Sequence, residues 1–165
     1  MPLKSKDRPT FYYKMDGELY TIRAGGVLFY KKVDDYVKLL MIRNRGKLED
    51  FGGCTDVMDT DIYDTFSREV EEESNKVFNK EDIKKRLGGL EPIMIKISKY
   101  LLFLMPLTEE EKKLKEADFG SIEFHDDINR TVEWIDAEKF NDIEFQNELN
   151  FRLRINSLKN LNIWK

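Results

Sequence analysis

The chain has 165 residues, of which 41% are hydrophobic and 36% charged, a composition typical of one globular domain and not of a disordered chain. Its net charge of -4 argues against a dedicated nucleic-acid binder, which usually has a basic surface. The single cysteine, Cys54, excludes an intrachain disulfide, and the lack of a long apolar stretch predicts a cytoplasmic protein without a membrane span. We therefore expect one domain over residues 1–165.

The N-terminal part has the turn residues and side-chain types of paired strands. Aromatic and β-branched residues at 11–13 and 19–23 flank Asp16-Gly17, which is a strong hairpin signal. Two further runs, at residues 27–32 and 36–43, are rich in β-branched and aromatic residues and are expected to be strands.

A helix is predicted after a long loop at residues 44–61, which is rich in Gly, Asp and Thr. Asp61 is a suitable N-cap, and Asp64 in the first turn interacts favourably with the helix dipole. We expect the helix over residues 62–74. Asn75 would end it, because Asn tolerates the left-handed backbone of a C-cap.

The second half of the chain alternates between strands and helices. The expected elements are a short helix at 82–86, one bent strand or two strands at 91–107, a solvated helix or mobile insertion at 109–116, a strand at 131–135, the start of a helix at 137–140 and an amphipathic helix at 144–161. The last helix would turn Phe145, Leu149, Leu153 and Leu158 inward. This order predicts an α/β fold with a mixed sheet between helices.

Four carboxylates crowd the six residues from Arg68 to Glu73. An acidic run by itself usually marks a solvated helix face. At about 100° per residue, however, Glu69 and Glu73 fall on or beside the apolar arc of the helix, and Glu72 falls on its flank. Carboxylates turned toward a core must be paired, hydrogen-bonded or bound to metal. Their i, i+3, i+4 spacing brings the three heads together, and oxygen donors of this kind suit Mg²⁺ or Mn²⁺.

The run from Gly53 to Asn75 resembles the Nudix box. That box is a glycine, a loop glutamate, then Arg-Glu, an apolar residue, any residue, Glu-Glu, any residue and a glycine. The Arg-Glu-Val-Glu-Glu-Glu sequence at 68–73 matches its core, and the likeness extends over about residues 20–160. The resemblance implies a Nudix-type α/β/α sandwich with a mixed central β-sheet. It also implies a hydrolase that cleaves the pyrophosphate bond of a nucleoside diphosphate linked to another moiety.

The resemblance assigns a role to each matching position. Glu69, Glu72 and Glu73 match the metal-binding glutamates, and Glu69 and Glu73 are also expected to be catalytic. Gly53 matches the glycine whose backbone carbonyl often joins the metal shell. Arg68 matches the arginine that braces the loop.

Three positions depart from the pattern of the family. The loop acid is Asp59, the spacing from Gly53 to Arg68 is one residue longer, and Asn75 replaces the closing glycine. A shorter acid can still pair with Arg68 if the inserted residue brings it closer. We therefore expect a divergent but competent site.

A carboxylate outside the helix is expected to help accept the proton of the attacking water. Glu123 is the first candidate, and Glu133 is less favoured because it lies within a predicted strand. His125, in the same loop as Glu123, is a further candidate for substrate contact. The other candidate substrate contacts are Arg23, Arg43, Arg45 and Lys47 for phosphate, and Tyr20, Phe51 and Phe124 for a base.

Three functions fit this sequence. The leading one is a pyrophosphohydrolase that uses Mg²⁺ or Mn²⁺ and acts on a nucleotide-type small molecule. The second is an mRNA-decapping enzyme of the same family with capped RNA as its partner, because boxes ending Glu-Glu-Ser and then Asn look like those of large DNA viruses, some of which decap. The third is a Nudix-fold binding module without turnover. A homodimer through the edges of the N-terminal hairpin is possible in each case.

Overall fold

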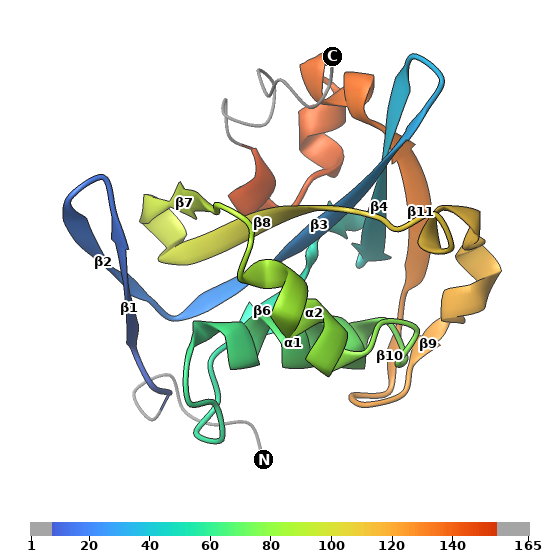
Figure 1. The fold of residues 1–165 in the computed structure, drawn as a ribbon. Coiled ribbons are helices and arrows are strands. Elements are labelled where there is room, and N and C mark those ends of the chain that lie inside the picture. Colours follow the sequence, from blue (N-terminus) through green and yellow to red (C-terminus); the bar gives the residue numbers. More distant parts are fainter. Residues whose placement is uncertain (1–7, 155–165) are drawn as a thin grey trace.

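The computed structural model describes residues 8–154. Figure 1 shows a twisted central sheet with α-helices against one face and short C-terminal helical turns against the other. The mixed α/β fold with a mixed central sheet is therefore as predicted. None of the helices in the described part is long and apolar enough to cross a membrane.

Seven strands in residues 8–154 form the central sheet. They are β3 (Ala24–Val33), β4 (Tyr36–Asn44), β5 (Lys47–Glu49), β6 (Phe51–Cys54), β7 (Ile93–Ile95), β8 (Tyr100–Pro106) and β11 (Thr131–Asp136). Strand β3 is central: it runs parallel to β8, and its other edge pairs with β6 along its first half and with β4 along its second. The strands β11 and β7 lie at the two ends of the order β11-β4-β3-β8-β7.

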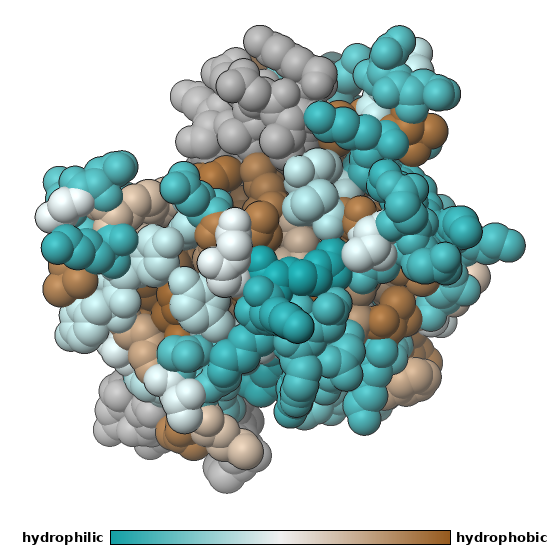
Figure 2. Space-filling model, in the orientation of Figure 1, coloured by the Kyte–Doolittle hydropathy of each residue, from teal (hydrophilic) through white to brown (hydrophobic). Residues whose placement is uncertain are grey.

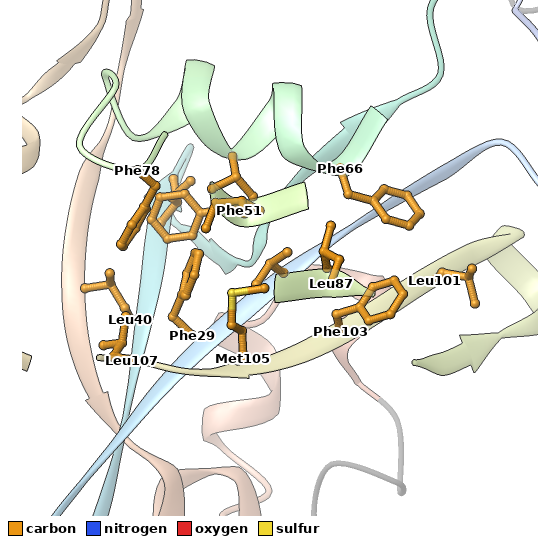
Figure 3. Packing of buried hydrophobic residues seen from close by; sticks show 14 of the residues in the cluster. Phe29, Leu40, Phe51, Phe66, Phe78, Leu87, Leu101, Phe103, Met105 and Leu107 are labelled. Carbon is orange, nitrogen blue, oxygen red and sulfur yellow. The ribbon is translucent and has the colours of Figure 1, made fainter. Parts of the chain in front are cut away.

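The middle of the sheet is buried on both faces, which explains the unbroken apolar runs at 27–29 in β3, 39–42 in β4 and 100–105 in β8. Side chains alternate across a strand, so Val27 and Phe29 face the α-helices while Leu28 faces the opposite layer. Figure 3 shows the core on the helical side, where aromatic rings dominate. The rings of Phe29 and Phe78 stack with their centroids 4.3 Å apart, and the Phe51 ring meets Phe29 edge-on at 5.5 Å.

Two α-helices, α1 (Ile62–Glu73) and α2 (Lys80–Leu87), cover one face of the sheet. As predicted, Asp61 is the N-cap of α1, and its side chain accepts a hydrogen bond from the Asp64 amide at 2.9 Å. Asn79 caps α2 in the same way. Helix α2 buries only its apolar side, and hydrophilic side chains cover the side that faces the viewer in Figure 2.

The opposite layer corrects one prediction. The expected helix at 144–161 is wrong within the described residues, where short 3-10 helices at Phe145–Glu148 and Phe151–Leu153 replace it. The expected helix start at 137–140 is likewise a 3-10 helix, Ala137–Asn141. The inward side chains were predicted correctly, since Phe145, Leu149 and Leu153 are all buried, while Leu158 lies outside the described residues.

The expected loop at 44–61 is also wrong in part, because β5 and β6 lie within it. Residues 91–107 form two strands, β7 and β8, and the insertion at 109–116 consists of 3-10 turns.

Two hairpins lie off the main sheet: β1 (Phe11–Met15) with β2 (Glu18–Ile22), and β9 (Ile122–Glu123) with β10 (Ile128–Asn129). The first turns at Asp16-Gly17 as predicted, with φ of 53° and 82°.

Candidate active site

Helix α1 carries the three inward acids of the predicted site. The side chains of Glu69 and Glu72 are only 17% and 18% exposed, so both are largely withdrawn from water. Glu73 is also partly buried, and its Oε1 accepts a hydrogen bond from the Gly52 amide at 2.7 Å. The apolar arc of the same helix is buried in the core, which fixes the rotation of α1 and hence the direction of these acids.

Arg68 joins α1 to the loop before it through a two-pronged ion pair. Its Nε lies 3.1 Å from Asp59 Oδ1 and its Nη2 lies 3.0 Å from Asp59 Oδ2. Asp59 is nearly fully buried and also accepts from the Thr65 hydroxyl at 2.7 Å and the Asp56 amide at 2.8 Å. Asp59, although one methylene shorter than glutamate, therefore reaches Arg68.

The same guanidinium contacts two of the site acids. Arg68 Nη1 lies 2.9 Å from Glu69 Oε1 and 3.5 Å from Glu72 Oε2, and Nη2 donates to the Cys54 carbonyl at 3.1 Å. As these side chains stand, no group of three or more acidic, His or Cys side chains in residues 8–154 is arranged to hold a metal ion. Arg68 contacts one oxygen of each of these two carboxylates.

Strand β6 lies directly against the acids. A Cβ added to Gly53 would sit 2.4 Å from the Glu69 carboxyl carbon, a distance that no side chain can occupy. The residue must be glycine for the carboxylate to pack on the backbone at this point. This packing brings the Gly53 backbone and Glu69 together, as the predicted site requires.

Burial leaves the negative charge of the cluster poorly compensated. It raises the pKa of Glu69 to about 7, although Arg68 opposes the rise. Burial raises the pKa of Glu72 as well and raises that of Glu73 well above its usual value, with Glu69 adding to the latter. A bound cation would relieve both the desolvation and the repulsion, so the donor set fits a hard divalent metal in its chemistry.

A second wall of the site comes from the segment at residues 119–130. Glu123 is only 4% exposed, and burial raises the pKa of its carboxyl, with Asp126 adding to the rise. The next two residues, Phe124 and His125, line a cleft together with Glu72. His125 Nε2 lies 3.5 Å from Glu72 Oε1, and the Phe124 ring is largely exposed. The predicted extra acid is therefore brought next to α1.

The other predicted substrate contacts are placed differently. Phe51 is fully buried among aromatic rings, so its predicted contact with a substrate is wrong. Arg43 pairs with Glu133 at 2.7 Å and Glu148 at 3.4 Å, and Lys47 donates to the Asn147 carbonyl.

Two further cations complete the predicted phosphate contacts. Arg45 is exposed in the β4–β5 turn, and the Arg23 side chain donates to the Arg8 carbonyl at 3.4 Å. The contacts named here for Arg23, Arg43 and Lys47 are with residues other than the acids of α1. A role of these four cations at a phosphate stays a prediction.

Sequence reasoning missed a buried network behind the β6 glycines. The carboxylate of Asp50, which is fully buried, accepts a hydrogen bond from the Tyr100 hydroxyl and pairs with Arg152 at 2.8 Å. Arg152 also lies 3.9 Å from Glu49 and 4.8 Å from the Tyr100 ring. Position in the sequence gives no signal for this network, because its members come from β5–β6, β8 and the C-terminal turns.

Comparison with known proteins gives a fold likeness. A crystal structure of a C. elegans Ap4A hydrolase is 18% identical, with a TM-score of 0.45 over 81% of this chain and 93% of that chain. A binary complex of a C. elegans Ap4A hydrolase is 15% identical, with a TM-score of 0.43 over 72% of this chain and 82% of that chain. No family model and no curated protein matches this chain. What the site can do therefore follows from its own residues.

Proposed function

We propose that this chain is a metal-dependent hydrolase of the Nudix superfamily that cleaves the pyrophosphate bond of a nucleoside diphosphate linked to another moiety. One observation carries the proposal: α1 turns Glu69 and Glu73 inward against the backbone of β6, with Glu72 beside them between Arg68 and His125, while Arg68 is braced by the loop acid. Buried acids must be paired, hydrogen-bonded or bound to a cation, and here one guanidinium, which already pairs with Asp59, is shared between Glu69 and Glu72. In a helix with only a structural role, inward acids would not add to stability.

The residues that would hold the cation are Glu69, Glu72 and Glu73, with the Gly53 carbonyl as a further oxygen donor. Carboxylate and carbonyl oxygens are the ligands of Mg²⁺ and Mn²⁺. Such a cation supplies charge neutralisation at the phosphates and a lower pKa for a bound water. The Arg68–Asp59 pair holds the loop between β6 and α1 in place, which keeps Gly53 beside Glu69.

Glu123 is our proposed general base. Water attacks one phosphorus of the diphosphate, a new P–O bond forms, the bridging P–O bond breaks, and Glu123 accepts the proton of the water. The proposal rests on the burial of Glu123 beside the acids of α1 and on its place next to the cleft. Glu133 is the weaker candidate, because its carboxylate is taken up by Arg43.

The substrate is proposed to enter along the cleft that Glu72, Phe124 and His125 line. An exposed aromatic ring beside a phosphate site suits stacking on a nucleobase. His125 stands 3.5 Å from Glu72 and is placed to donate to a phosphate oxygen. These two residues favour a nucleotide-type substrate.

The test is product identity from a panel of free nucleotides and capped RNA incubated with Mn²⁺. Hydrolysis of a nucleotide at its pyrophosphate bond is expected, and the variants Glu72→Gln and Glu123→Gln should lower kcat by at least about 100-fold. Glu138→Gln, a change at an exposed glutamate of the opposite layer, is the matched control and should keep full activity. If only capped RNA is hydrolysed, the proposed small-molecule substrate is wrong and the protein is a decapping enzyme.

A binding module without turnover has one observation in its favour, namely the contacts of Arg68 with Glu69 and Glu72. In such a module Arg68 would neutralise the acids permanently. The two readings differ in metal binding: a hydrolase takes up Mn²⁺ and the Glu72→Gln variant loses that uptake. If Glu72→Gln and Glu73→Gln leave Mn²⁺ affinity unchanged and raise the melting temperature, the acids are structural.

A further inference from the structure

Asn75, the residue after the C-cap of α1, does more than terminate the helix. Helix α1 ends at Glu73 with Ser74 as its C-cap, one residue earlier than predicted, and Asn75 follows with a left-handed backbone, with φ of 54°. Its side chain makes three hydrogen bonds to a distant segment: Nδ2 donates to the carbonyls of Phe119 and Ile122, both at 2.8 Å, and Oδ1 accepts from the Phe124 amide at 2.9 Å. These partners flank Glu123 on both sides.

Arg130 makes a second connection between the same two parts. It is 5% exposed, and its guanidinium donates to the Glu73 carbonyl at 2.8 Å, to Gly120 at 2.6 Å and to Phe119 at 3.0 Å. A cation at the last carbonyls of a helix is also favoured by the helix dipole. The end of α1 and the segment at 119–130 are therefore tied together from both sides.

We propose that Asn75 is a positioning residue that holds Glu123 beside the acids of α1. This inference rests on the proposed function, in which Glu123 accepts the proton of the attacking water. The backbone alone does not explain Asn75, because glycine adopts the left-handed conformation with less strain. What glycine lacks is the amide side chain that reaches the carbonyl of Ile122 and the amide of Phe124, the neighbours of Glu123 on either side.

The first arm of the test measures amide hydrogen exchange in Asn75→Gly without any substrate. Glycine keeps the helix end, so exchange in α1 should be unchanged, whereas the Phe124 amide and its neighbours should exchange at least about 10-fold faster. Lys76→Gly is the matched control: Lys76 is the next left-handed residue, with φ of 66°, and is exposed. That variant should leave exchange at 119–124 as in the native chain. Unchanged exchange at Phe124 in Asn75→Gly would overturn the proposal.

The second arm is a double-mutant cycle with Glu123→Gln. Asn75→Gly should lower kcat about 10-fold, because it misplaces a reacting group. In the Glu123→Gln background the same change should cost less than about 2-fold, since there is no base left to misplace. An equal loss of kcat in both backgrounds would show that Asn75 does not act through Glu123 and would overturn the proposal.

The two arms separate this inference from the proposed function. If the native chain hydrolyses no nucleotide, the proposed function fails, and the exchange arm still decides whether Asn75 holds the segment. If the native chain is active and exchange at Phe124 is unchanged in Asn75→Gly, the function stands and the positioning role fails.

Discussion

At the residue scale, Asp59 compensates for its shorter side chain by its place in the loop. The loop between Gly53 and Arg68 contains a turn at 56–59, where the Asp59 amide donates to the Asp56 carbonyl at 2.9 Å. Asp59 thus receives four side-chain and backbone donors in a buried position. Charge-assisted hydrogen bonds of this kind are about twice as strong as neutral ones.

The change Asp59→Asn should therefore destabilise the fold and disturb the acids. Removing one partner of a largely buried ion pair is expected to lower the free energy of unfolding by about 2–3 kcal/mol. Arg68, no longer neutralised, would bind Glu69 and Glu72 more tightly, so Mn²⁺ affinity should fall about 10-fold. Urea unfolding and isothermal titration measure the two effects. Asp56→Asn in the same turn is the control, and an equal loss of stability there would contradict the prediction.

Glu69 should make stability depend on pH in an unusual direction. Its pKa is raised from 4.5 in the unfolded chain to about 7, with burial as the main cause. Between these values the unfolded chain has lost the proton and the folded chain keeps it, so the free energy of unfolding falls as pH rises from about 4.5 to about 7. This pKa shift corresponds to a fall of about 3 kcal/mol in the free energy of unfolding across that pH range.

Glu69→Gln tests this, because glutamine does not titrate. With a chelator present, the variant should gain stability relative to the native chain at pH 8 and not at pH 4, as measured by denaturant unfolding. Glu138→Gln should follow the native curve at both values. A constant difference between Glu69→Gln and the native chain across this range would mean that Glu69 titrates normally.

At the element scale, α1 was predictable from the sequence and much of its surroundings was not. The helix has a local N-cap, a local apolar arc and a left-handed residue just beyond its C-cap, all readable within fifteen positions. Strands β5 and β6 are three and four residues long and contain two glycines, so no periodicity marks them. They are strands because β3 and β4 pair with them.

The C-terminal turns show how a correct burial pattern can predict a wrong element. Phe145, Leu149 and Leu153 are spaced by four, as on a helix, and all are buried. The chain between them is instead extended at Leu149, with ψ of 144°, and the Asn150 side chain caps a new turn by accepting from the Arg152 amide. Asn and Ser side chains compete with helical hydrogen bonds in this way.

The ion pair between Arg152 and Asp50 links these turns to the start of β6, and its contribution to stability can be tested. Arg152→Met should lower the free energy of unfolding by about 3–5 kcal/mol, because it leaves the carboxylate of Asp50 buried without its cation. The double change Asp50→Asn with Arg152→Met removes the unpaired charge and should recover more than half of the loss, as measured by urea unfolding. A double variant as unstable as the sum of the single ones would contradict this account.

At the scale of the whole molecule, the acids of α1 should make global stability depend on divalent cations. A ligand that binds only the folded state at 100 times its Kd adds about 2.7 kcal/mol. We expect Mn²⁺ to raise the melting temperature of the native chain and chelation to reverse the rise, as followed by calorimetry. Glu72→Gln should lose this dependence and Glu138→Gln should keep it. The same rise in both variants would place the cation elsewhere.

The predicted homodimer also belongs to this scale and stays a prediction. The β1–β2 hairpin stands out from the sheet in Figure 1, and its Tyr12 and Leu19 side chains are largely exposed. Sedimentation analysis over a range of concentrations measures the oligomeric state directly. Lysine at both positions should leave a monomer if the hairpin is the contact.

The parallel pairing of β3 with β8 has a consequence for how the chain acquires its site. Ala24 pairs with Tyr100, and the chain between them contains β6, Asp59 and all of α1. Closing so long a loop is entropically demanding and slow. During synthesis, the acids of α1 leave the ribosome before β8 does, and therefore before β8 can pair with β3. The growing chain therefore carries its acids in a hydrated state, and their burial is complete only after the later segment at 119–130, tied to the end of α1 by Asn75 and Arg130, has been made.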